Sequence, residues 1–191
     1  MSAPLMNKTV RSVCVFCASS SEISQEYFEM AETLGAMLAK AGVRLVYGGA
    51  QGGLMGACAD AALAEGGEVI GVIPKVLSSQ ERAHKKLSTL HVTPDMHTRQ
   101  QKMAQLADMF VILPGGLGTL AEFFEIVTWK QIGLHDKPIV VVNTNGYWDG
   151  LAQMLDQCES QGFFHGELTD LILIVDSSQN IEVIKNFFTT E

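Results

Sequence analysis

A glycine-rich turn followed at once by an acid is the part of this sequence best suited to chemistry. The stretch VILPGGLGTLAEFFE, residues 111–125, joins an apolar run to an amphipathic run that carries Glu122. Glycine lets backbone N–H groups approach a ligand closely, and the first N–H groups of a helix are unpaired and partly positive. The turn therefore predicts a phosphate site beside a carboxyl group that is available for acid-base catalysis.

Two further junctions have a composition that suits anions. CASSS, residues 17–21, contains Ser20, and VYGGAQGGLMG, residues 46–56, contains Gly48 and Gly49. These glycines could serve only tight turns and helix packing, but three such junctions favour ligand binding. The spacing matches neither GxxxxGK[ST] nor GxGxxG, which disfavours a P-loop NTPase and a dinucleotide oxidoreductase.

Glu122 and Arg99 each have a structural alternative. Thr119 and Glu122 have the spacing of a capping box, in which the acid bonds to the backbone at the start of its own helix. A nearby phosphate would instead raise the pKa of Glu122 and favour acid-base use. Arg99 lies in DMHTRQQKMAQLAD, residues 95–108, just before the apolar run of the turn. It could bind phosphate, contact Glu122 or belong to a solvated basic helix face.

Seven apolar runs of strand length alternate with helical patterns and must position these residues. The runs are residues 12–17, 43–48, 68–74, 88–92, 109–114, 138–143 and 171–175. This alternation predicts an α/β, Rossmann-like doubly wound sheet, mainly parallel, with helices on both faces, in a single domain over residues 1–191. Residues 1–10 are expected to be a flexible N-terminus.

Ligands of such sheets bind beyond the carboxyl ends of the strands, where the winding direction reverses. If the first and fifth runs are neighbours there, the serine junction and the glycine turn face one crevice.

Charge and length limit the classes of function. The chain has 191 residues and a formal net charge of −8, which repels a nucleic-acid backbone. No apolar stretch reaches the roughly 18 residues that a spanning helix needs. The first ten residues lack the apolar segment of a secretory signal. We therefore expect a cytoplasmic protein that binds neither nucleic acid nor a membrane.

The cysteine and histidine residues do not have the spacing of a metal site. Cys14 and Cys17 are three apart in one apolar run, so their side chains point to opposite faces, while Cys58 and Cys158 lie in distant helical stretches. The histidines form neither an HExxH motif nor a pair at i, i+4. We expect buried thiols, no metal and no cofactor.

Taken together, these motifs resemble those of the LOG ("lonely guy") family. PGGLGTLAE matches the family's PGGxGTxxE motif, and VYGGAQGGLMG, GVIP, DMHTR and IVTWKQIG follow in the family's order and spacing over about residues 12–188. The resemblance implies a cytokinin riboside 5′-monophosphate phosphoribohydrolase. Such an enzyme releases the free base and ribose 5-phosphate from a nucleoside 5′-monophosphate, and the resemblance also implies a homodimer.

The resemblance assigns roles to individual positions. Arg99 and Glu122 correspond to the family's catalytic pair, and Glu81 and Thr128 look like its nucleotide contacts. The positions that match its phosphate cradle are Gly115, Gly116, Gly118 and Thr119. Ser20 could assist in phosphate binding.

The chain departs from the family pattern beside the arginine. Thr98 and Gln100 stand where the family commonly has Glu and Lys. The nucleotide contact expected of that lysine is therefore missing from this sequence, which bears on substrate preference.

Other functions remain open on the sequence. The chain could be an AMP or purine nucleotide nucleosidase, or a non-catalytic nucleotide carrier or sensor. A pyridoxal-phosphate decarboxylase needs a Schiff-base lysine, and none lies in the three junctions. The helical stretch after the glycine turn has more apolar residues than one buried stripe needs, namely Phe123, Phe124, Ile126, Val127 and Trp129. This excess fits a dimer interface or a wholly buried helix.

Overall fold

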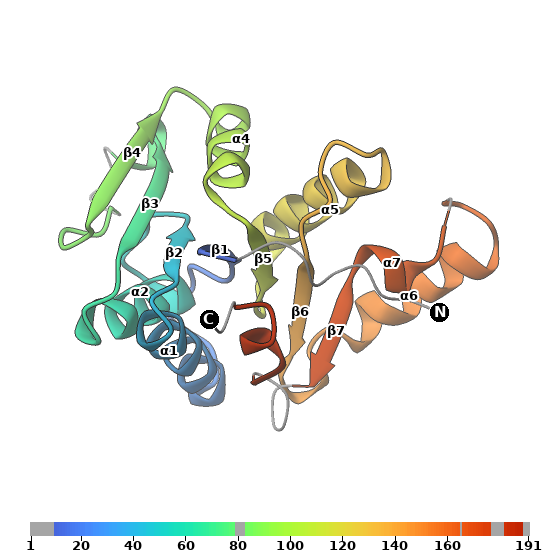
Figure 1. The fold of residues 1–191 in the computed structure, drawn as a ribbon, viewed down its shortest axis with the longest axis horizontal. Coiled ribbons are helices and arrows are strands. Elements are labelled where there is room, and N and C mark those ends of the chain that lie inside the picture. The colour runs from blue at the N-terminus through green and yellow to red at the C-terminus, as the bar shows by residue number, and fades with distance from the viewer. Residues whose placement is uncertain (1–9, 79–82, 165, 177–181, 189–191) are drawn as a thin grey trace.

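One parallel sheet contains all seven predicted strands. The computed structural model describes residues 10–78, 83–164, 166–176 and 182–188 (Figure 1). The sheet order is β4-β3-β2-β1-β5-β6-β7, and every neighbouring pair is parallel. The strands are β1 (Ser12–Phe16), β2 (Arg44–Tyr47), β3 (Val69–Pro74), β4 (Thr89–Thr93), β5 (Met109–Ile112), β6 (Ile139–Asn143) and β7 (Leu173–Asp176). The α/β doubly wound prediction is confirmed.

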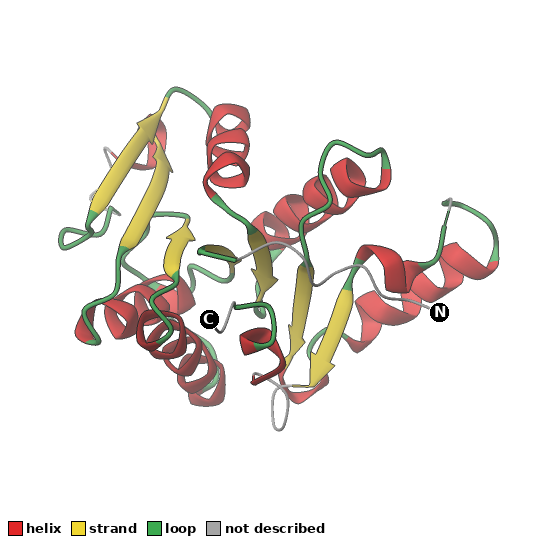
Figure 2. Ribbon diagram, in the orientation of Figure 1, coloured by secondary structure: helices red, strands yellow, loops and turns green. Residues whose placement is uncertain are grey.

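Helices connect successive strands and cover both faces of the sheet (Figure 2). The helices are α1 (Gln25–Lys40), α2 (Gly53–Ala64), α3 (Lys75–Ser78), α4 (Met96–Leu106), α5 (Leu117–Gln131), α6 (Asp149–Ser160) and α7 (Leu168–Leu171), with a 3₁₀ turn, η1 (Thr144–Gly146). Figure 1 shows α1 and α2 packed side by side.

Alternate residues of β1 enter two separate cores. Val13 and Val15 join the core beneath α1 and α2, whereas Cys14 and Phe16 join the core beneath α4, α5 and α6. Side chains on a strand alternate between faces, so a strand covered on both sides is apolar throughout. Cys17 lies in the first core, which confirms that Cys14 and Cys17 face opposite ways.

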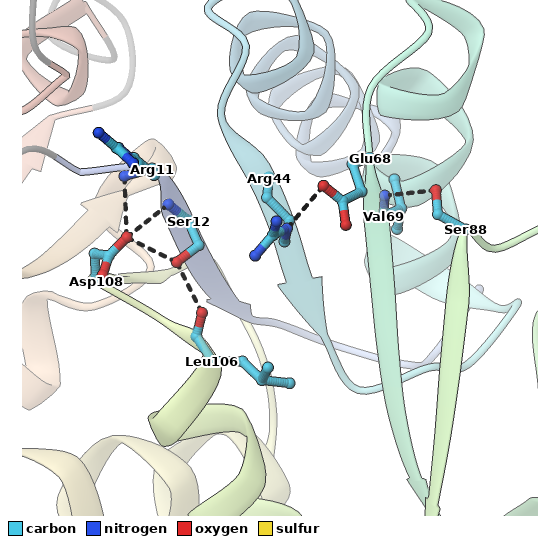
Figure 3. Close-up of polar contacts among 8 residues, drawn as sticks. All are labelled: Arg11, Ser12, Arg44, Glu68, Val69, Ser88, Leu106 and Asp108. Carbon is cyan, nitrogen blue, oxygen red and sulfur yellow. Dashed lines mark hydrogen bonds and ion pairs between the residues drawn. The ribbon is translucent and has the colours of Figure 1, made fainter.

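The winding direction reverses between β1 and β5. These strands are neighbours, as the sequence analysis required, with Val13 aligned to Met109. At their amino ends, the Asp108 carboxylate accepts hydrogen bonds of 3.0 Å from the N–H groups of Arg11 and Ser12 (Figure 3). The Ser12 hydroxyl lies 2.7 Å from the Leu106 carbonyl oxygen. These contacts fix the pair of strands whose opposite ends carry the serine junction and the glycine turn.

The N-terminal prediction lies mostly outside the described residues. Residues 1–9 are not described, and Val10 is buried against the core of α1 and α2. In the described part of the chain, no helix has the length and apolar character needed to cross a membrane.

The close contact between α1 and α2 generates a stability prediction. A Cβ atom at Gly35 would lie 2.1 Å from the carbonyl oxygen of Cys58, which is backbone and cannot rotate away. We expect Gly35→Ala to lower the free energy of unfolding by about 1–3 kcal/mol, because the helices must separate. Urea denaturation measures this change.

Gly150, in the first turn of α6, is the matched control. A Cβ atom there would meet nothing within 4 Å. Gly150→Ala should leave the free energy of unfolding unchanged or raise it by up to about 1 kcal/mol. Equal stability of the two variants would contradict the role given to Gly35.

Candidate active site

A buried ion pair joins α4 to α5. Arg99 Nη1 lies 2.6 Å from Glu122 Oε1, and the two side chains are 6% and 4% exposed. Arg99 Nε also donates a 3.0 Å hydrogen bond to the carbonyl oxygen of Val72 in β3. Of the three possibilities for Arg99, contact with Glu122 is therefore confirmed, and the solvated helix face is wrong.

The start of α4 explains where Arg99 points. Asp95 is the N-cap residue, and its Oδ1 accepts a 2.7 Å hydrogen bond from the N–H of Thr98. This cap fixes the first helical turn, so that Arg99 and Met103, one turn later, face inward and are both buried. Thr98 is one of the departures from the family pattern, and its backbone N–H is the group that donates to the cap.

Glu122 does not belong to a capping box. Helix α5 begins at Leu117 with Gly116 as the N-cap, so Thr119 lies inside the helix. The Glu122 carboxylate turns to Arg99 instead of the backbone at Thr119. Thr119 packs against Gly115, where a Cβ atom would lie 2.1 Å from its Oγ1. The capping alternative is therefore wrong.

The two glycines after β2 have packing roles beside the ion pair. A Cβ atom at Gly48 would lie 2.3 Å from Arg99 Nη2, so only glycine leaves room for the guanidinium. Gly49 has a φ of +77°, a backbone conformation that glycine adopts readily. The structural explanation for these glycines is thus correct in part, and their contact with a ligand stays a prediction.

The three anion-suited junctions lie together at the carboxyl ends of the strands. The N–H of Ala18 donates to the carbonyl oxygen of Pro114 at 3.1 Å, which links the serine junction to the glycine turn. The N–H of Met55 donates to the Ala18 carbonyl oxygen at 3.3 Å, and the N–H of Gly53 donates to Ser21 Oγ at 3.2 Å. The predicted convergence of the serine junction and the glycine turn is confirmed.

Three helices begin at these junctions without a side-chain cap. Their N-cap residues, Ser24 of α1, Gly52 of α2 and Gly116 of α5, accept no N–H of the first turn through a side chain. Cβ atoms at Gly116 and Gly118 would meet nothing within 4 Å, so the glycine turn faces open space. In the first turn of α2, the N–H groups of Gly53 and Met55 are already bonded to Ser21 Oγ and to the Ala18 carbonyl oxygen. The starts of α1 and α5 therefore suit an anion such as phosphate best, through their first N–H groups and their partial positive charge.

Burial and two charged neighbours set the protonation of Glu122. Burial raises its pKa, the charge of Arg99 lowers it, and the nearby Glu125 raises it again, so that the net direction is upward. Glu125 lies one turn further along α5, and burial raises its own pKa. A carboxyl group with a raised pKa beside junctions that suit an anion can serve in acid-base catalysis.

The remaining predicted contacts are not brought to the ion pair. Ser20 is exposed in the serine junction, and its Oγ accepts a 3.3 Å hydrogen bond from the N–H of Glu22. Thr128 lies on the exposed face of α5, about a third of a turn around the helix from Glu122. Glu81 falls outside the described residues. Their nucleotide contacts stay predictions.

The sequence analysis missed Tyr147. Its hydroxyl donates a 2.7 Å hydrogen bond to the carbonyl oxygen of Gly115, in the glycine turn. Tyr147 follows an Asn-Gly pair directly after β6, and Asn145 has a φ of 54°. An Asn-Gly turn at the carboxyl end of a strand next to β5 was the available signal. Within the described residues, no group of three or more His, Cys, Asp or Glu side chains is placed to hold a metal ion.

Comparison with known proteins gives both a family and a fold. A family described as "Possible lysine decarboxylase" matches residues 55–186. The chain is 47% identical over 156 residues to a cytokinin riboside 5′-monophosphate phosphoribohydrolase of Rhodococcoides fascians, covering 81% of this chain and 79% of that protein. It is 37% identical over 171 residues to one from Arabidopsis thaliana, covering 90% and 80%.

A solved structure has the same fold. The molybdenum cofactor binding protein of Rippkaea orientalis superposes with a TM-score of 0.70 over 96% of this chain and 99% of that one, at 21% identity. This likeness concerns the fold alone.

The buried ion pair predicts a pH-dependent loss of stability. In Arg99→Met the Glu122 carboxylate loses its partner, so its pKa in the folded state rises further above the unfolded value. Stability from such a group is present below the unfolded pKa and is lost as the pH rises through the folded pKa. We expect the free energy of unfolding to fall by about 3–5 kcal/mol near pH 8 and by less near pH 5, measured by urea denaturation.

Lys102→Met removes a positive charge from the same helix and serves as the control. It should cost little at either pH, because Lys102 is only half-buried. The double variant Arg99→Met/Glu122→Gln should be more stable near pH 8 than Arg99→Met alone. A loss in Arg99→Met that is independent of pH would show that lost packing, and not the unpaired carboxylate, causes it.

Proposed function

Because the chain belongs to the LOG family of cytokinin riboside 5′-monophosphate phosphoribohydrolases, we propose that it hydrolyses the N-glycosidic bond of a cytokinin nucleoside 5′-monophosphate. The products are the free base and ribose 5-phosphate. The observation that carries this proposal is the buried Arg99–Glu122 pair next to the glycine turn, where α5 begins without a side-chain cap. A carboxylate and an anion site are the two parts that such a reaction needs.

Glu122 acts on the sugar carbon that carries the base. Hydrolysis breaks the bond between C1′ and a ring nitrogen, and the electron pair leaves with the base. Positive charge then builds at C1′, where the Glu122 carboxylate stabilises it. The oxygen of a water molecule bonds to C1′. The proton that this water loses passes through Glu122, and the departing nitrogen takes up one proton.

Arg99 holds the carboxylate ready for this step. Its bond to Glu122 leaves the other carboxylate oxygen to face substrate or water, and its charge opposes the effect of burial on the pKa of Glu122. The Val72 carbonyl oxygen fixes the guanidinium from the opposite side. Arg99 thereby orients Glu122 and favours its ionised form against the effect of burial.

The glycine turn binds the 5′-phosphate. The N–H groups between Gly115 and Thr119 hold its oxygens, and the Ser20 hydroxyl assists. Phosphate binding at a distance from C1′ supplies positioning energy for the reacting bond and explains a preference for monophosphates over nucleosides. Gly48, Gly49, Glu81 and Thr128 are proposed to contact the rest of the nucleotide.

A second copy of the chain is proposed to cover α5. Exposed positions recur along this helix at i, i+4, i+7 and i+11, namely Leu117, Ala121, Phe124 and Thr128, and the apolar surface continues at Ile132 and Leu134. Leu117 is 87% exposed and Ile132 is 63% exposed, so the alternative of a wholly buried helix is wrong. A homodimer through this face would remove the apolar stripe from water.

The cytoplasm is the proposed compartment. All four cysteines are free, and Cys14, Cys17 and Cys58 are buried. Burial raises the pKa of Cys58 to about 12, which makes its thiol unreactive. Unpaired thiols of this kind fit a reducing compartment.

The proposed activity predicts a specific pattern of product release. Purified protein is incubated with isopentenyladenosine 5′-monophosphate, AMP and the two matching nucleosides, and free base and ribose 5-phosphate are followed. We expect release from the prenylated monophosphate and none from the nucleosides. In Glu122→Gln, kcat should fall by at least about 100-fold with little change in nucleotide affinity, because the amide cannot accept a proton.

Glu65→Gln is the control for this experiment, since Glu65 is an exposed residue at the end of α2, paired with Lys40. It should retain wild-type turnover. Faster release from AMP than from the prenylated substrate would favour a purine nucleotide nucleosidase. Nucleotide binding without any product would replace the hydrolase by a carrier or sensor.

The proposed dimer predicts the effect of a charge on α5. Ile132→Asp places a carboxylate in the exposed apolar stripe, at the end of the helix away from the glycine turn. We expect the molar mass from light scattering at low protein concentration to shift from dimer toward monomer, because burying the new charge is costly.

Phe163→Asp provides the comparison, because Phe163 is 77% exposed beyond the end of α6. Its molar mass should match that of the wild type. A monomeric wild type, or equal dissociation of both variants, would refute the interface on α5.

A further inference from the structure

Tyr147 reaches the glycine turn from a different part of the chain. It lies in the connection between β6 and α6, and its hydroxyl donates a 2.7 Å hydrogen bond to the carbonyl oxygen of Gly115. The side chain is partly exposed, so burial of the ring alone does not explain its position. The bond instead fixes one peptide group of the turn.

The fixed peptide group joins Gly115 to Gly116. In a trans peptide the carbonyl and the N–H point in opposite directions, so a bond that holds the Gly115 carbonyl also sets the direction of the Gly116 N–H. With glycine on both sides, this peptide would otherwise rotate at little steric cost. In the described part of the chain, no group accepts a hydrogen bond from the Gly116 N–H. It is free to donate to a ligand.

Aromatic contacts and nearby hydrogen bonds hold the Tyr147 side chain in place. Its ring contacts Tyr27 of α1 edge to face at 5.8 Å between centroids, and Trp148 in the same way at 4.8 Å. Asn143 Oδ1 accepts a 2.7 Å hydrogen bond from the N–H of Trp148, which ties this connection to the end of β6. The Asn145 side-chain amide also bonds to Glu26 at the start of α1.

These contacts join two of the three anion-suited junctions. The first turn of α1 carries Tyr27 and follows the serine junction, while Tyr147 bonds directly to the glycine turn. The hydroxyl of Tyr147 is therefore held from α1 and β6 at a fixed place relative to the start of α5.

We propose that Tyr147 is a positioning residue for phosphate recognition, because its hydroxyl holds the Gly115 carbonyl and thereby aims the Gly116 N–H at the substrate's 5′-phosphate. This inference rests on the proposed phosphoribohydrolase function and assigns a determinant of its monophosphate selectivity. Tyr147 acts through the turn and takes no part at C1′. Its loss weakens substrate binding without slowing the chemical step.

Tyr147→Phe tests the inference because it removes the hydroxyl and keeps the ring. We expect KM for the nucleoside monophosphate to rise about 3- to 10-fold, the usual effect of one lost hydrogen bond, while kcat stays within about twofold. The inhibition constant of ribose 5-phosphate should rise by the same factor, since this product keeps the phosphate and lacks the base.

Tyr27→Phe is the matched control. It removes a hydroxyl from the same aromatic pair and leaves the bond between Tyr147 and Gly115 in place. Its KM and inhibition constant should equal those of the wild type. Unchanged values in Tyr147→Phe, equal changes in both variants, or a loss confined to kcat would overturn the inference.

Failure of the proposed function gives a different result. In that case the wild type itself cleaves no monophosphate, whatever the state of Tyr147. Calorimetric binding of ribose 5-phosphate then decides the inference without turnover. Weaker binding by Tyr147→Phe than by Tyr27→Phe supports it, and equal binding overturns it.

Discussion

The candidate site depends on one requirement, that a carboxylate buried beside an anion site must have a charged partner. Arg99 meets this requirement for Glu122, and residues from other parts of the chain hold the arginine side chain in position. Asp95 caps α4 so that the arginine faces inward, and the Val72 carbonyl oxygen fixes its Nε. A buried ion pair gains little over apolar packing, so stability alone gives little reason for this pair, and the catalytic role proposed for Glu122 would supply one.

The parallel sheet supplies the remaining constraint. Because every strand runs the same way, each connection to a following helix begins at the same edge, and helix starts collect there. Reversal of the winding between β1 and β5 brings together the two junctions that precede α1 and α5, and α2 joins them through Gly53 and Ser21. Helix starts gathered at one edge of the sheet are suited to bind an anion even in a chain whose net charge is negative.

The sequence was sufficient for the sheet but not for every contact of the site. Runs that are apolar on both faces predicted parallel strands. The pairing of β1 with β5 was only a condition in the sequence analysis, and the sheet order meets it. The spacing from Thr119 to Glu122 is compatible with a capping box and with a catalytic acid. The capping box could be excluded only once the first residue of α5 was known. The contacts of Arg99 with Gly48 and of Tyr147 with Gly115 could not be predicted. They join residues that are distant in the chain and depend on side-chain direction.

The contact between Gly48 and Arg99 also limits the order in which substitutions can accumulate. While the arginine is present, a methyl group at position 48 would collide with its guanidinium. A descendant that first replaced the arginine by a smaller residue would tolerate alanine at position 48 more easily, since only the flexible Met55 side chain would then have to shift. Once that alanine was fixed, restoring the arginine alone would recreate the collision. No single substitution would then easily restore the ion pair. Substitutions that remove the pair would therefore accumulate more readily than substitutions that restore it.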